Sequence, residues 1–124
     1  MNTKFSYMYR DGSNYKACND VVLEGECTFK DIEQFLDDGM WFIPSQVGLS
    51  DLQYKLFAYD GPGEDDHVWH EINDGDFEPT DEEPTAPITA SAFIENMRKA
   101  HTDGWDITGA MDRNSIGEEI WQQK

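Results

Sequence analysis

Residues 4–9 read Lys-Phe-Ser-Tyr-Met-Tyr, and this stretch decides the fold class. Polar and aromatic residues largely alternate along it, which places the three aromatic side chains on one face of a β-strand. Residues 11–14, Asp-Gly-Ser-Asn, have the composition of a turn. A second strand is predicted at about residues 15–24, so we expect an antiparallel hairpin whose connection is longer than two residues.

Two helices are predicted to cover this hairpin. Thr28 can cap the first helix, and Asp31, three residues later, completes a variant of the capping box. We expect this helix over about residues 28–38, where an Asp-Gly pair ends it. The second helix is expected over about residues 90–102, because Thr or Ser can cap it and apolar residues recur at helical spacing along one side.

The remaining segments give weaker patterns. Residues 40–43, Met-Trp-Phe-Ile, predict a buried strand that ends at the following proline. Residues 45–49 are expected to be a loop, and residues 51–58 a short helix. Residues 67–72 alternate well enough to predict another strand. Residues 78–87 contain three prolines and four acids, which indicates an extended surface segment.

Together these patterns predict an α+β fold, with a small antiparallel sheet of three or four strands packed on one face by two main helices. The length of 124 residues suits a single domain spanning residues 1–124. Residues from about 105 to 124 are set apart as a peripheral C-terminal extension, because their pattern is weaker. No internal repeat marks a solenoid.

The charge of the chain limits its partners. With 26 acids against 9 Lys and Arg, the formal charge is −17. This charge argues against direct binding to nucleic-acid phosphates, which requires clustered Lys and Arg, and against docking on anionic lipid. It favours a basic protein surface as the partner, because opposite charges speed encounter. The alternative is that the acidity only maintains solubility.

A cytoplasmic protein is expected. No apolar run approaches the roughly 18 residues that indicate a membrane span, and the N-terminus lacks the apolar region of a signal peptide. Cys18 and Cys27 match no metal or redox spacing, so we expect them to be reduced, with a disulfide as the alternative. The oligomeric state is left open.

The acidity is concentrated in the middle of the chain. Residues 56–97 carry twelve acids and no Lys or Arg, whereas both ends are nearly balanced. We therefore predict a non-enzymatic domain whose acidic face binds a protein. In the sharper version this face imitates nucleic-acid charge and inhibits a basic nucleic-acid-handling or defence protein, as small acidic phage and plasmid proteins do. The alternative is a solvated loop. The predicted face consists of Glu64, Asp65, Asp66, Asp74, Asp76, Glu78, Asp81, Glu82 and Glu83.

The alternative function is metal or small-ligand binding. His67, His70 and Glu71 form the densest set of potential ligands, and their nitrogen and oxygen atoms suit zinc or another divalent ion. Their spacing differs from the His-Glu-x-x-His motif of metalloproteases, and on a strand residues 67 and 70 would face opposite sides. The competing interpretation makes His70 a hydrogen-bonded, half-buried structural residue. Otherwise no cofactor is expected, and no catalytic motif is present.

Three stretches together resemble a known family. Tyr-Arg-Asp-x-x-Asn-Tyr-Lys at residues 9–16, Phe-Ile-Pro-x-Gln-Val-Gly-Leu-x-x-Leu-Gln at residues 42–53 and Asp-Asp-His-x-Trp-His-Glu at residues 65–71 are similar to motifs of small uncharacterised bacterial proteins. The resemblance covers roughly residues 5–80. It implies no activity and no catalytic residues.

If these motifs meet in space, they form a shared pocket or patch. Its candidate residues are Arg10, Lys16, Gln46 and Trp69, together with the two histidines. The alternative is that the motifs are turns and caps that specify the fold, with Asp11 and Asn14 shaping a loop and Gln46 bonding to backbone.

Overall fold

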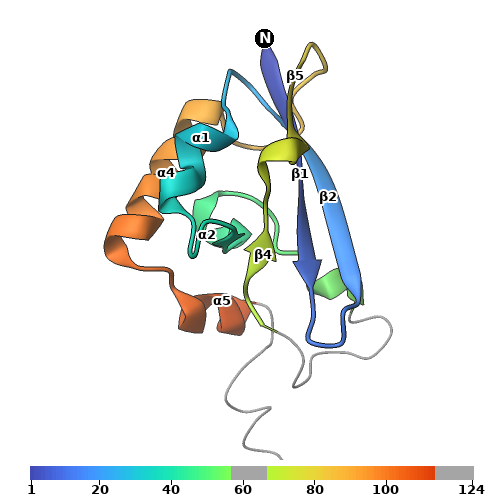
Figure 1. The fold of residues 1–124 in the computed structure, drawn as a ribbon, viewed down its shortest axis with the longest axis vertical. Coiled ribbons are helices and arrows are strands. Elements are labelled where there is room, and N and C mark those ends of the chain that lie inside the picture. The colour runs from blue at the N-terminus through green and yellow to red at the C-terminus, as the bar shows by residue number, and fades with distance from the viewer. Residues whose placement is uncertain (57–66, 114–124) are drawn as a thin grey trace, which may run out of the picture.

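The computed structural model describes residues 1–56 and 67–113 (Figure 1). Its first two strands, β1 (Asn2–Arg10) and β2 (Lys16–Leu23), pair antiparallel. Every second side chain of β1 is buried, as alternation predicts for a sheet with one covered face. The predicted hairpin is confirmed, with five residues between the strands.

The hairpin loop is shaped by its own polar side chains. The Asp11 carboxylate accepts hydrogen bonds from the backbone N–H groups of Ser13 and Tyr15, each at 2.9 Å. Asn14 has a φ of 70°, in the left-handed region that asparagine tolerates. Asp11 and Asn14 therefore have the loop-forming role that the fold-specifying interpretation gives them.

The sheet has five antiparallel strands within the described residues, one more than the upper sequence estimate. Its main path runs β2-β1-β4-β3, with β4 (His70–Glu71) beside the C-terminal half of β1 and β3 (Trp41–Phe42) beyond it. The additional strand, β5 (Phe77–Thr80), pairs with the N-terminal half of β1. Residues 78–87 were predicted to be an extended surface segment; most of them are exposed, as expected, but the strand pairing of residues 78–80 with β1 was not predicted.

The first helix is shorter than predicted. After the Thr28 cap, α1 (Phe29–Ile32) continues as a 3₁₀ turn, η1 (Glu33–Phe35), and ends before residue 38. The predicted capping box is present, since the Asp31 carboxylate accepts from the Thr28 N–H at 2.8 Å. Asp38 and Gly39 both have positive φ and, with Met40, form a three-residue turn between Asp37 and Trp41 instead of a helix terminus.

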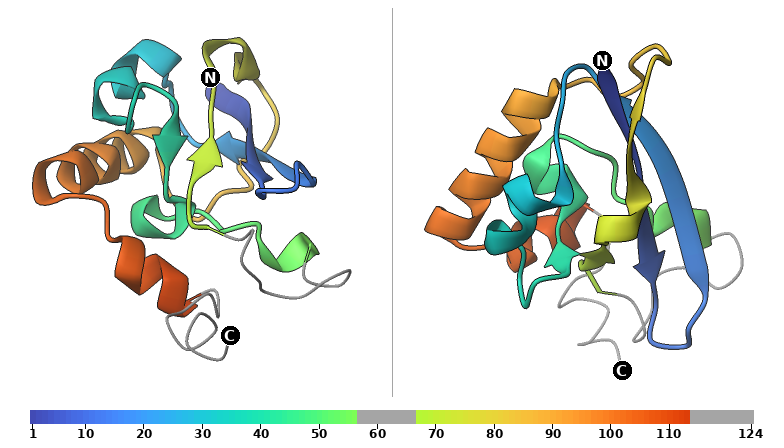
Figure 2. Two further views of the ribbon diagram at one scale, coloured as in Figure 1. Left: turned by 60° about the horizontal axis from the view of Figure 1, so that its bottom comes forward. Right: turned by 45° about the horizontal axis from the view of Figure 1, so that its top comes forward.

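The second main helix, α4 (Ala90–Asp103), is confirmed with its predicted buried side chains Phe93, Met97 and Ala100. Figures 1 and 2 show α1 and α4 on the same side of the sheet. The aromatic face of β1 forms the core beneath them. Phe5 packs between Phe77 and Phe93, with ring centroids at 4.9 and 5.4 Å.

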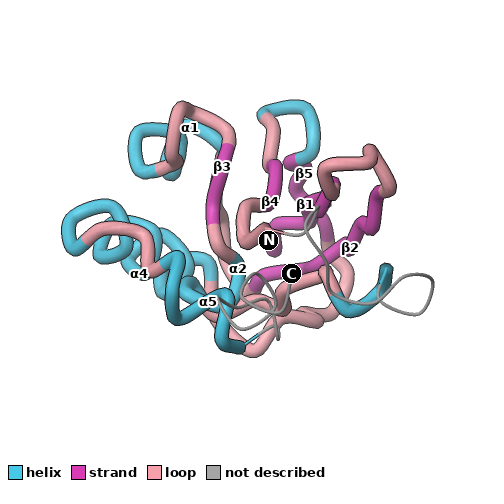
Figure 3. Tube along the Cα trace, turned by 90° about the horizontal axis from the view of Figure 1, so that it is seen from below, coloured by secondary structure: helices cyan, strands magenta, loops and turns pink. Residues whose placement is uncertain are grey.

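Two short helices were not expected. Residues 44–47 form α2 (Pro44–Val47) where a loop was predicted. Residues 105–113, set apart as an extension, include α5 (Ile107–Arg113), whose Ala110 is fully buried in a small second core with Ile43 and Val68. Figure 3 shows α5 below α4, beside the strands.

One further expectation is only partly described. Of the predicted helix at 51–58, residues 54–56 are helical, and those from 57 onward lie outside the described residues. A short 3₁₀ turn, η2 (Asp74–Asp76), leads into β5. Within the described ranges, no helix is both long and apolar enough to cross a membrane.

Candidate functional site

Three segments meet at one end of the molecule, around the start of β1. The Thr3 hydroxyl donates to the Gly25 carbonyl at 2.8 Å and accepts from the Cys27 N–H at 2.9 Å. Asn2 donates from its side-chain amide to the Glu82 carbonyl at 2.9 Å. We call the surface formed by residues 2–4, 24–28 and 74–83 the acidic end; it lies at the top of Figure 1.

The acidic end contains eight acids and one base, Lys4. Six members of the predicted binding face lie here, joined by Glu24 and Glu26 from the segment after β2. Among the described residues, Glu82 is the one of these acids with an ion pair, to Lys4 at 3.1 Å. This hydrogen-bonded pair raises the pKa of Lys4 and lowers that of Glu82. The six predicted members are Asp74, Asp76, Glu78, Asp81, Glu82 and Glu83.

The other three members of the predicted face, Glu64, Asp65 and Asp66, lie outside the described residues. Whether they extend the acidic end stays a prediction. The described acids alone give this end a strong excess of negative charge, because Lys4 offsets one of eight.

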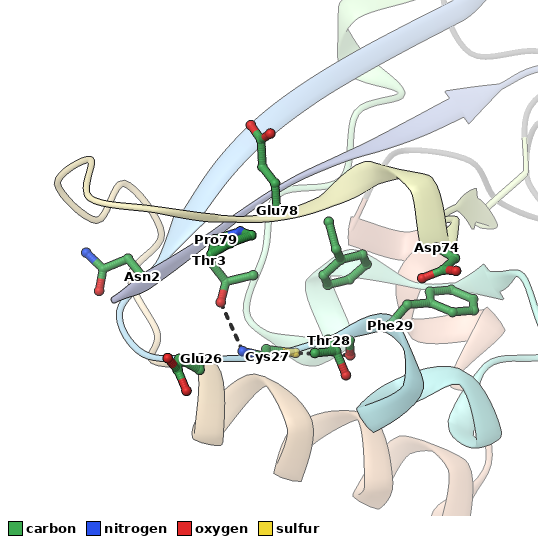
Figure 4. Close-up of a pocket in the computed structure, with 10 residues that line it drawn as sticks. Asn2, Thr3, Glu26, Cys27, Thr28, Phe29, Asp74, Glu78 and Pro79 are labelled. Carbon is green, nitrogen blue, oxygen red and sulfur yellow. Dashed lines mark hydrogen bonds between the residues drawn. The ribbon is translucent and has the colours of Figure 1, made fainter.

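A hollow of about 360 Å³ opens in the acidic end, between the 26–29 segment and β5 (Figure 4). Its carboxylates belong to Glu26 and Asp74, which Figure 4 shows at opposite ends of the hollow. The Glu78 side chain points away from it. Apolar groups line the space between them, namely Cys27, Phe29, Phe77 and Pro79.

The side-chain donors that line this hollow are already used within its wall. Asn2 donates to Glu82, and the Thr3 hydroxyl donates to Gly25. The Cys27 thiol bonds to the Thr28 carbonyl, and the Thr28 hydroxyl donates to Asp31. Burial also raises the pKa of Cys27 to about 12, so this thiol stays protonated at neutral pH. Apart from the second N–H of the Asn2 amide, the side chains therefore offer an incoming group acceptors, in the form of carboxylates, and no unbonded donor.

The backbone at the edge of β5 beside the hollow also presents hydrogen-bond acceptors without donors. Pro79 has no N–H, so the hydrogen-bonded pairs with β1 must be Lys4 with Glu78 and Asn2 with Thr80. Phe77 and Pro79 consequently direct their backbone groups away from β1. The Phe77 N–H donates to the Asp74 carbonyl. Phe77 and Pro79 thus expose carbonyl acceptors without N–H donors, which also prevents an added strand from pairing regularly here.

The two histidines of the predicted metal set are held by backbone groups. His70 is fully buried; its Nε2 accepts from the Leu52 N–H at 3.0 Å, which leaves Nδ1 to donate to the Val68 carbonyl at 3.1 Å. Burial lowers the pKa of His70 to about 4. His67 is held in the same way, with Nδ1 accepting from Trp69 N–H at 3.0 Å and Nε2 donating to the Arg10 carbonyl at 2.7 Å.

The third member, Glu71, is also engaged. Its carboxylate, with 10% of the side chain exposed, accepts from Nε of Arg10 at 3.0 Å. Metal binding by His67 or His70 would have to break one backbone bond at the ring of each histidine. Within residues 1–56 and 67–113, no group of three His, Cys, Asp or Glu side chains is arranged to hold a metal ion.

The candidate residues from the family motifs do not share one pocket. Arg10 bonds Glu71 and, at 2.6 Å, the Asn14 side chain. Lys16 lies opposite Arg10 in the hairpin and is exposed. Gln46 donates to the Gly104 carbonyl at 3.2 Å and accepts from the Asp106 N–H at 2.7 Å, which ties α2 to the segment before α5.

Two of the candidates, His67 and Trp69, do share a second hollow, which Asp37 and Trp41 also line. Sequence reasoning assigned Trp69 to a pocket but gave Trp41 no such role. The same reasoning missed the pairing of Glu26 with Asp74 across the first hollow. No local signal links those two acids, because they line one hollow only when β5 pairs with β1.

No protein-family model matches this chain. No curated protein matches it, and no solved structure does. The resemblance to small bacterial proteins stays a prediction, and function has to be inferred from the geometry of the chain's own residues.

Proposed function

We propose that this chain is a non-enzymatic binding domain whose acidic end docks on a basic surface of a partner protein. The observation that carries the proposal is the hollow between Glu26 and Asp74, whose side chains provide two carboxylate acceptors, while all side-chain donors but one N–H of Asn2 are already bonded. Such a wall favours a group that only donates. Among protein side chains, Lys and Arg donate and never accept.

The shape of the hollow suits a long basic side chain. Phe29 and Phe77 contact each other edge to face, with centroids 6.1 Å apart, and offer an apolar surface to the methylene stem of Lys or Arg. The charged head would lie at the Glu26 or the Asp74 carboxylate. An anchor of this kind at the centre of an interface is a typical hot spot.

The remaining acids would act at longer range. Asp81 and Glu83 are exposed, and no ion pair neutralises them within the described part of the chain. A field of one sign raises the association rate with an oppositely charged partner, and salt reduces this effect. In its sharper form, we propose that the partner handles nucleic acid and that the acidic end occupies the surface which binds phosphates.

Charge reversal at the acidic end tests the proposal. The variant Asp74→Lys/Asp81→Lys/Glu83→Lys changes three exposed residues and leaves the Lys4–Glu82 pair intact. The wild-type chain, immobilised at low salt, is used to capture its partner from cells that express it, and affinity for that purified partner is then measured. We expect the triple variant to bind at least about tenfold more weakly.

The matched control reverses the same number of exposed acids elsewhere, as Glu33→Lys/Asp103→Lys/Asp112→Lys. Both variants have the same net charge, so a loss confined to the first variant locates the interface. If both variants lost affinity for the partner equally, net charge alone would explain the effect, and a localised site would be contradicted. Duplex DNA tests the sharper form, because it should compete with the chain for the captured partner; a ternary complex would contradict it.

A further inference from the structure

The second hollow, of about 310 Å³, lies at the opposite edge of the sheet from the β1–β2 hairpin. Its described lining residues are Asp37, Trp41, His67 and Trp69. Three of these four residues are aromatic, and both tryptophans are half-buried. A wall of indole rings beside a carboxylate is a chemically specific combination, and it takes no part in the acidic end.

Backbone bonds fix one tryptophan against the carboxylate. The three-residue turn at residues 38–40 brings Asp37 across from Trp41, where the two residues exchange N–H···O bonds of 2.8 and 2.9 Å. Trp41 then enters β3 and pairs with Glu71. The backbone therefore places Trp41 and Asp37 side by side at one end of the sheet edge without help from a ligand.

The other walls are equally constrained. Trp69 packs edge to face on Trp105, with ring centroids 6.2 Å apart and an interplanar angle of 73°. Its backbone N–H donates to Nδ1 of His67, so that nitrogen carries no proton, and Nε2 donates to the Arg10 carbonyl. With both nitrogens used, the His67 ring acts in this arrangement as a neutral aromatic wall.

We propose that this hollow binds a methylated ammonium group. The negative faces of indole rings attract a cation, and aromatic cages use this attraction to recognise quaternary ammonium. The Asp37 carboxylate adds a charge of the right sign. A primary ammonium carries three donors and a guanidinium five, whereas the described lining offers one free acceptor group; a methylated ammonium keeps its charge and needs few acceptors.

The proposal goes beyond the docking of a basic surface on the acidic end. It concerns other residues and another ligand chemistry. Two sources could supply the group, a free choline-like molecule or a methylated lysine side chain, and both present the same methylated cation to the rings.

Titration with choline tests the proposal, with 3,3-dimethylbutan-1-ol as its neutral isostere. Binding is followed through the indole N–H signals in ¹H–¹⁵N NMR spectra of the full chain. We expect saturable choline binding with a Kd on the order of millimolar, and at least about tenfold weaker binding of the neutral isostere. Nα-acetyl-trimethyllysine amide forms a second arm, and the tighter of the two cations identifies the source.

Variants separate the hollow from its surroundings. Trp41→Leu should weaken choline binding at least about tenfold, and Trp41→Phe by a smaller factor, since phenyl is the weaker cation binder. Tyr15→Leu removes an exposed aromatic ring that does not line the hollow and should bind choline as the wild type does. The charge-reversed acidic-end variant should also bind choline normally.

Equal affinities for choline and its neutral isostere would overturn the proposal, because the hollow would then be merely apolar. Absence of saturable choline binding up to about 100 mM, well above the millimolar Kd expected, would overturn it as well. An acidic-end variant that loses choline binding would assign the signal to bulk charge, which also contradicts a site at Trp41. None of these results depends on the partner of the acidic end.

Discussion

At the scale of single residues, several buried polar side chains bond to backbone groups of other segments, although Gln53 Oε1 and Trp105 Nε1 are buried without a partner among the described residues. His70 is the clearest case, because its ring bridges Leu52 and Val68 from different segments and leaves neither nitrogen free. The fully buried ring contacts Tyr9, at a centroid distance of 5.2 Å. His70, which the sequence suggested as a metal ligand, therefore links two chain segments through hydrogen bonds to their backbones.

His70 predicts a specific pH dependence of stability. Burial lowers its folded pKa to about 4 from an ordinary value of 6.5, and the nearby Asp51 does not offset this effect. Between these values the unfolded chain binds more protons than the folded chain, so stability falls as pH decreases. From pH 7.5 to 5.5 the free energy of unfolding should lose about 1 kcal/mol through this residue.

Urea unfolding of wild type and His70→Gln at the two pH values measures this contribution. Glutamine can still accept from the Leu52 N–H but does not titrate, so the variant should lose about that part of the pH dependence. His101→Gln is the control, since His101 is exposed and should leave the pH dependence largely unchanged. An unaltered slope in His70→Gln would contradict a neutral, proton-resisting His70.

At the scale of elements, α4 depends on its cap. Thr89 accepts the Ala92 N–H at 3.1 Å through its hydroxyl, at the point where the helix begins. Removing this acceptor in Thr89→Ala should cost about 1 kcal/mol, measured as a lower urea midpoint with an unchanged slope. Thr89→Ser should retain most of the stability. Thr102→Ala, in the exposed last turn, should change it less; an equal loss there would contradict the capping account.

The same elements show how far sequence reasoning reaches. The hairpin and α4 were predictable because alternation and helical spacing are local, and both elements have one buried side. The strand β5 was not, because Pro79 removes a donor that only an unpaired edge can spare. The helix α2 was missed because Pro44 suggested a stop, although proline suits the first turn of a helix.

Some features of the candidate sites could also be predicted from the sequence, and others could not. The charge of residues 74–83 is visible in the sequence, and so is the aromatic character of Trp69. The two hollows are not, because each joins residues from separate segments. Glu26 and Asp74 line one hollow because β5 pairs with β1, and Trp41 and Trp69 line the other because β3 pairs with β4.

At the scale of the whole molecule, the charges are separated along the sheet. Most acids of the acidic end surround the start of β1, whereas Arg10, Lys16 and Lys55 lie near its far end. The acids of the acidic end therefore repel one another at one end of the molecule. This arrangement also gives the molecule a direction in the field of a basic partner, which favours approach with the acidic end first.

This repulsion predicts that salt stabilises the free protein while weakening its complex. The Debye length falls from about 30 Å at 0.01 M to about 3 Å at 1 M salt, so NaCl screens the acids of the acidic end from one another. We expect the melting temperature to rise by several degrees, with about 1 kcal/mol corresponding to roughly 4 °C for a domain of this size. A melting temperature that falls with salt would mean that ion pairs outweigh repulsion.

The two charge-reversed variants locate the repulsion. Both have the same net charge, so a uniform effect would stabilise them equally at low salt. If the repulsion is concentrated at the acidic end, Asp74→Lys/Asp81→Lys/Glu83→Lys should melt higher than Glu33→Lys/Asp103→Lys/Asp112→Lys in 10 mM salt, and the difference should shrink in 1 M salt. Charge reversal at the acidic end should relieve repulsion within the chain and weaken attraction to the partner. A variant that is more stable and binds its partner more weakly would show that the same acids have both effects.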